Sequence, residues 1–183
     1  MFLPGMTNEV DTFLGTLGDE LDSLRRSAAD LTDEQARTRT TRSELTVGGI
    51  VKHVTFGLRG LQGRLAAAPD APSADLDMDA RIAEWSASFA LTEDETLADV
   101  LTAYDSARAD LFDTLGRCDM SDPSYYPPQP WFGIDATQIS MRWAVAHTLV
   151  EVAHHAGHAD IIREELDGAT TESLAGITWE PEG

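Results

Sequence analysis

The chain has 183 residues, of which 42% are hydrophobic and 25% charged, a composition that fits one globular domain and excludes wholesale disorder, collagen-like repeats and disulfide-dense folds. Thirty-two acidic against 13 basic residues give a net charge of −19, which argues against a general binder of nucleic acid or of an anionic membrane. With one cysteine, no apolar run long enough to span a membrane and no signal-peptide pattern, the sequence predicts a soluble cytoplasmic protein.

Two segments of the N-terminal half have apolar residues at the three-and-four spacing of an α-helix. In residues 8–29 the stripe comprises Val10, Phe13, Leu14, Leu17, Leu21 and Leu24. A turn and a fresh helical start follow at residues 31–35. In residues 46–68 the stripe comprises Val47, Ile50, Val51, Val54, Leu58, Leu61 and Leu65. We therefore expect two long helices joined by a short connection.

Two further long helices are predicted in the C-terminal half, after a connector in which residues 77–88 favour a short helix. Residues 94–117 carry a third apolar stripe, and residues 121–133 form a loop with four prolines. The fourth helix covers residues 137–166 and stops at Gly168, a common C-terminal glycine signal. The sequence thus predicts one all-α domain over residues 1–183, a four-helix bundle with long connections, in which residues 167–183 form a C-terminal tail.

Four of the five histidines lie on the predicted fourth helix, between residues 147 and 158. At about 100° per residue, they fall with Glu151 within an arc of roughly 100°. The rest of this helix is apolar over most of its circumference, which predicts a buried helix. A buried helix carries such groups only where they are paired or bind a metal, and Glu151 and His155 have the spacing by which adjacent turns grip one ion.

The remaining histidine, His53, supplies the missing ligand from the middle of the second long helix. Glycines at positions 49, 57 and 60 lie beside it and leave room for a ligand or for the close approach of another helix. We predict that His53, Glu151 and His155 hold one ion between the second and fourth long helices. Two imidazoles and one carboxylate suit Zn, Ni or Fe(II) and leave a coordination position open. Taken singly, His147, His154 and His158 have the alternative of being ordinary core or surface residues.

The segments LTVGGIVKHV (45–54) and RWAVAHTLVEVAHHAGHADIIRE (142–164) resemble the DinB-like superfamily, and more closely its DUF664 branch. The resemblance implies an up-up-down-down-like four-helix bundle, a homodimer, and a divalent metal held by a histidine of the second helix and two residues of the last. Because Glu151 stands at the first of those paired positions, the chain is similar to mycothiol-dependent maleylpyruvate isomerases and mycothiol S-transferases, whose ligands are His, Glu and His.

The activity that this resemblance implies joins a low-molecular-weight thiol to an electrophile. A thiol with a pKa near 8.5 is mostly protonated at neutral pH, and coordination to a divalent cation, most simply zinc, deprotonates it. His147 or His158 would take the released proton. The Arg-, Ala- and Asp-rich composition is typical of GC-rich genomes and favours mycothiol as the thiol. We therefore expect a metal-dependent mycothiol S-transferase.

Several interpretations stay open at this point. Residues 125–132 form either an aromatic lid, in which Tyr126 and Trp131 contact the substrate, or a cover over the end of the bundle. Arg163 is assigned to a carboxylate of the substrate, with a surface ion pair as the alternative, and Cys118 is read as a small semi-buried thiol rather than a nucleophile. Two other functions compete: a metal-binding or stress-response protein without turnover, and a hydrolase whose open position binds water.

Overall fold

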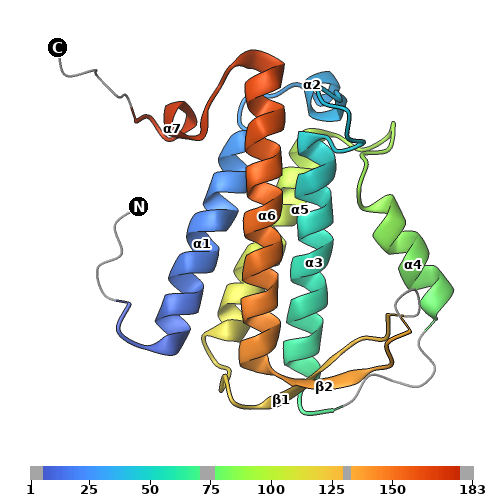
Figure 1. The fold of residues 1–183 in the computed structure, drawn as a ribbon, viewed down its shortest axis with the longest axis vertical. Coiled ribbons are helices and arrows are strands. Elements are labelled where there is room, and N and C mark those ends of the chain that lie inside the picture. Colours follow the sequence, from blue (N-terminus) through green and yellow to red (C-terminus); the bar gives the residue numbers. More distant parts are fainter. Residues whose placement is uncertain (1–5, 71–76, 130–132, 178–183) are drawn as a thin grey trace.

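Four long helices form the body of the computed structural model, which describes residues 6–70, 77–129 and 133–177. They are α1 (Glu9–Ser27), α3 (Val47–Ala67), α5 (Leu97–Leu115) and α6 (Met141–Asp167), as Figure 1 shows. Shorter helices occupy the connections and the C-terminal region: α2 (Asp33–Arg37), α4 (Met78–Ala87) and α7 (Thr171–Leu174). The predicted all-α class and the four-helix bundle are confirmed.

Each long helix begins at a polar side chain that accepts a hydrogen bond from a backbone N–H of the first turn. These N-cap residues are Asn8, Thr46, Thr96 and Ser140. The α6 helix ends as predicted at Gly168, whose φ of 78° is left-handed. It starts four residues later than expected, because residues 137–140 pair as a strand instead.

That strand belongs to a small antiparallel hairpin at the lower end of the bundle in Figure 1, which the sequence did not predict. Strand β1 (Pro123–Tyr126) pairs with β2 (Thr137–Ser140), with Tyr126 opposite Thr137. Strands of four residues are too short to reveal an alternating pattern. The hairpin places Tyr126 against the bundle, whereas Trp131 lies outside the described residues.

The direction of the helices differs from the up-up-down-down order that the resemblance implies. In Figure 1, α1 runs up, α3 and α5 run down, and α6 runs up again. The short connection with α2 reverses the chain between α1 and α3, whereas the long connection with α4 returns it to the top of the bundle. The α3 and α6 helices, which carry the predicted ligands, are therefore antiparallel neighbours.

One continuous apolar core holds the four helices together, and its largest fully buried side chains include Leu17, Leu21, Leu58, Tyr104, Leu111 and Val145. The expectation that α6 is buried all round is wrong. Trp143, Val150 and Ile161 are 44%, 50% and 58% exposed, because α1 and α3 cover only part of its circumference. No helix in the described ranges is both long and apolar enough to cross a membrane.

Candidate functional site

A cavity of about 1290 Å³ lies beside the bundle, between α3, α4, α6 and the segment that follows β1. Its walls include five of the residues predicted from the sequence, namely His53, Tyr126, His147, Glu151 and His155. The fold therefore brings the three predicted metal ligands and the predicted proton acceptor His147 into one space, from two helices almost a hundred residues apart in the chain.

Two imidazoles form the centre of this site. The ring centroids of His53 and His155 are 4.9 Å apart, with an angle of 67° between the ring planes. Burial, and then the neighbouring His155, lowers the pKa of His53 to about 4. Burial also lowers the pKa of His155, against the opposing charge of Glu151. Both rings are therefore neutral at pH 7, and neutral imidazole is the form that binds metals.

The hydrogen bonds around Ser88, at the end of α4, decide which nitrogen of His53 carries the proton. The Ser88 hydroxyl donates its one proton to the carbonyl oxygen of Trp85, at 2.6 Å. It therefore accepts at its 2.8 Å contact with Nδ1 of His53, which must be the N–H donor. The lone pair of His53 is thus on Nε2, and such fixing of the tautomer is the usual role of a hydrogen-bond partner behind a metal-ligating histidine.

The donor set fits a divalent metal in kind, although the three side chains are not assembled around one point. Within the described residues, no three His, Cys, Asp or Glu side chains are arranged to hold an ion. However, Nδ1 of His155 is buried without a hydrogen-bond partner, an arrangement that calls for an ion or water. Glu151 is exposed one turn before His155 and lines the same cavity as the two imidazoles.

The glycines beside His53 have two different roles. A Cβ built on Gly49 would lie 2.1 Å from the carbonyl oxygen of Phe89, so this glycine permits the backbone after α4 to approach α3. That approach stacks the Phe89 ring on His53, at 3.9 Å between centroids. At Gly57, in contrast, a Cβ would meet nothing within 4 Å, and this glycine leaves open space in the cavity.

His147 lies two turns before His155 on α6, next to the hairpin. Its ring stacks on Trp143 at 4.8 Å, and the hydroxyl of Tyr126 is 3.4 Å from its Nε2. Burial, and then the charge of Glu151, raises the pKa of Tyr126, while Arg64 opposes this change. Tyr126 thus stays a neutral phenol at pH 7 and forms a wall of the cavity together with His147.

Three other sequence candidates lie outside the cavity. His154 and His158 are exposed, and although the ring of His158 is 6.1 Å from that of His155, it does not line the cavity. The catalytic role of His158 stays a prediction from the sequence. Cys118 donates from its thiol to the carbonyl oxygen of Thr114 at 3.2 Å, and burial raises its pKa, which disfavours the nucleophilic thiolate.

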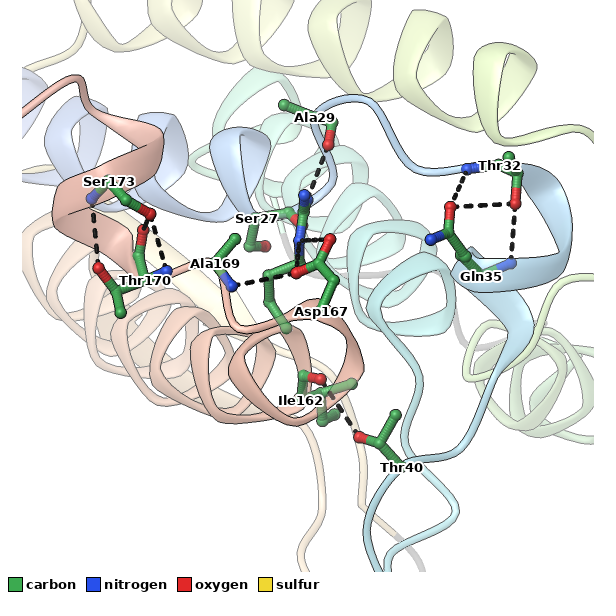
Figure 2. Close-up of polar contacts among 11 residues, drawn as sticks. Ser27, Ala29, Thr32, Gln35, Thr40, Ile162, Asp167, Ala169, Thr170 and Ser173 are labelled. Atoms are coloured by element: carbon green, nitrogen blue, oxygen red, sulfur yellow. Dashed lines mark hydrogen bonds and ion pairs between the residues drawn. The ribbon is translucent and has the colours of Figure 1, made fainter.

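The structure places Arg163 in an ion pair, the alternative considered beside a substrate carboxylate, and its guanidinium is buried rather than at the surface. Arg163 is 5% exposed, donates from Nε to Asp167 at 2.9 Å, and donates from Nη1 to the carbonyl oxygens of Ser27 and Ala29. Figure 2 shows these three acceptors together, where the end of α6 meets the chain after α1. The buried guanidinium thus joins these segments, and its ion-pair partner Asp167 lies at the surface.

Residues of the α4 region form the part of the site that the sequence did not indicate. Ser88 and Phe89 contact His53 from a connector that is far from α3 in the sequence, and no local pattern marks them. Arg64 had a usable signal: it follows His53 by 11 residues, three helical turns, which places it on the same face of α3.

The fold and the site together define a helical-bundle protein with a histidine-lined cavity between its second and last long helices. The family model for mycothiol S-transferases matches residues 12–168, and the chain belongs to this family of the DinB-like superfamily. A crystal structure of a conserved protein from Enterococcus faecalis is similar, with a TM-score of 0.62, 14% identity, and coverage of 89% of this chain and 99% of that chain. This likeness shows the fold alone. No curated protein matches the chain.

Replacing Ser88 by alanine is expected to weaken metal binding about 10- to 100-fold, because His53 loses the acceptor that fixes its tautomer and its orientation. A zinc titration against a competing chelator measures the affinity, and ¹⁵N NMR of the metal-free protein reports the tautomer directly. Ser86→Ala changes an exposed serine of the same helix and serves as the control. Unchanged zinc affinity and an unchanged tautomer in Ser88→Ala would contradict the role given to Ser88.

Proposed function

We propose that the protein is a metal-dependent S-transferase that joins mycothiol to an electrophile, with His53, Glu151 and His155 as ligands of a divalent ion, most simply zinc. The observation that carries the proposal is the pair of neutral imidazoles 4.9 Å apart, lining one cavity with Glu151, in a chain of the mycothiol S-transferase family. Nickel and Fe(II) suit the same ligand set.

A divalent ion, when bound, lowers the pKa of a thiol so that it reacts as the thiolate. The chain's own residues prepare this chemistry. Ser88 holds the Nδ1–H of His53, which directs the free lone pair of Nε2, and Phe89 covers one face of that ring and keeps water from it. His147 is the proposed acceptor of the thiol proton, since its Nε2 faces the cavity next to the neutral hydroxyl of Tyr126.

The size of the cavity favours an enzyme over a protein that only stores metal. About 1290 Å³ exceeds by far what one ion needs, and it is ample for a small organic substrate. Aromatic side chains line the cavity together with the imidazoles, namely Phe56, Trp85 and Tyr126. Contact of Tyr126 and Trp131 with the substrate remains a prediction from the aromatic residues of the 125–132 loop, and assembly as a homodimer remains a prediction from the resemblance.

The proposal is tested by rates of conjugate formation with mycothiol, bacillithiol, glutathione and cysteine, each against one electrophile. Mycothiol is expected to react fastest, metal removal to abolish the reaction, and Cys118→Ser to leave the rate unchanged because the cosubstrate supplies the nucleophile. Equal rates with and without metal, or loss of activity only in Cys118→Ser, would refute the mechanism. If no thiol reacts while metal stays bound, a non-catalytic metal-binding protein becomes the better interpretation, and hydrolysis of ester substrates would favour a hydrolase.

A further inference from the structure

Arg64 also lines the cavity that contains the two imidazoles. It follows His53 by 11 residues on α3, roughly 16 Å along the helix axis. Gly57 and Gly60 lie between them on that face, and the side chain of Arg64 folds back over this lane, since a Cβ on Gly60 would be 3.5 Å from its Nη1. The guanidinium therefore lies near Gly60, seven residues or roughly 10 Å along the helix axis from His53.

The guanidinium of Arg64 has no anionic partner in the described part of the chain. Its Nε is buried and without a hydrogen-bond partner, and its one face contact is the ring of Tyr126, 5.9 Å from Cζ. Burial lowers the pKa of Arg64, and the nearby charge of Arg81 lowers it further, against an opposing effect of Tyr126. A cation so placed lacks the acceptors that normally offset the cost of burial.

The other basic side chains of the cavity, Lys52, Arg59 and Arg81, differ from one another in this respect. Lys52 is neutralised by Glu95, whose carboxylate is 2.8 Å from Nζ, and it also donates to the carbonyl oxygen of Ala90. Arg81, from α4, lines the cavity next to Arg64 and likewise forms no ion pair within the described ranges. Acidic side chains such as Glu84 and Glu151 also line the cavity, but neither of the two neighbouring arginines forms an ion pair within the described residues, which leaves both guanidinium groups available to an anion.

We propose that Arg64, supported by Arg81, binds a carboxylate group of a substrate whose reacting end reaches His53 and His155. The inference that this ligand is a substrate rests on the proposed function, whereas the anion site itself is independent of that function. A planar carboxylate matches the guanidinium fork and supplies the acceptors that Arg64 lacks. The aromatic side chains of Trp85 and Tyr126, which line the cavity, suit an apolar or aromatic body between the carboxylate and the reacting end. The proposed ligand class is therefore an elongated aromatic carboxylate.

Binding of phenylbutyrate and of its uncharged primary amide to the purified full-length protein, measured by calorimetry, tests the anion site without turnover. The carboxylate is expected to bind at least tenfold more tightly than the amide. Arg64→Gln is expected to remove that difference, and Arg64→Lys to keep part of it, because a lysine retains the charge without the fork. Arg117→Gln, which removes one charge from an exposed ion pair on α5's C-terminal side, is the control and should match the unaltered protein.

Equal affinity for the acid and the amide would overturn the proposal. An affinity difference that is unchanged in Arg64→Gln would also overturn it, because the carboxylate would then bind elsewhere, for example at the metal. Circular dichroism confirms that each variant is folded. A kinetic comparison then identifies the source of the anion: a rise in KM for a carboxylate-bearing electrophile, with kcat kept, assigns it to the electrophile, and a rise in KM for the thiol assigns it to the thiol. If the protein transfers no thiol at all, the proposed function fails, while the calorimetry still decides the anion site.

Discussion

Alanine at both His53 and His155 is expected to reduce bound divalent metal from about one ion per chain to nearly none, because the two imidazoles supply most of the proposed ligand set. Glu151→Gln is expected to lose less, since it removes the anionic ligand but keeps its shape and both histidines. Metal content after dialysis against zinc, measured by mass spectrometry, checks these expectations.

His154→Ala is the matched control, because His154 is adjacent to His155 in sequence but exposed and outside the cavity. It should retain full metal content. The bundle should also stay folded in the double variant, since the apolar core does not depend on the site. Full occupancy in the folded double variant would exclude His53 and His155 as the metal ligands.

Gly49→Ala is expected to destabilise the fold by about 3 kcal/mol, because the added Cβ would lie 2.1 Å from the rigid backbone carbonyl of Phe89. The free energy of unfolding in urea measures the effect. Gly57→Ala is the matched control: the new Cβ meets nothing within 4 Å, so it should gain up to about 1 kcal/mol from helix propensity. A loss below about 1 kcal/mol in Gly49→Ala would show that the segment after α4 moves easily away from α3.

Helical periodicity was sufficient to predict the long helices, because their apolar stripes repeat over several turns. The predicted ligands His53 and His155 lie close together for the same reason, because the apolar stripes beside them pack against each other. The α4 contacts to His53 were not predictable, since a long connector leaves its own placement to tertiary packing. The hairpin was missed because each strand has only four residues.

The sequence was less successful at predicting which polar side chains of a helix are buried and which are exposed. Arg163 lies outside the histidine arc of α6 and is buried against the chain after α1, whereas His158 lies within that arc and is exposed to solvent. Angular position alone does not say which neighbouring element covers a side chain, or whether any does. Arg64 is the opposite case. Its spacing from His53 places both residues on one face of α3, but no other residue in the sequence indicated a role for Arg64.

The construction of the cavity separates two kinds of evolutionary change. None of the α4 residues is fully buried, so this helix contributes a wall to the cavity without contributing to the core. Substitutions on its cavity side alter which molecules fit at little cost in folding stability, whereas the ligands on α3 and α6 are tied to the packing of the bundle. The same fold can therefore acquire new substrates through substitutions in the α4 connector, while the proposed metal ligands on α3 and α6 stay unchanged.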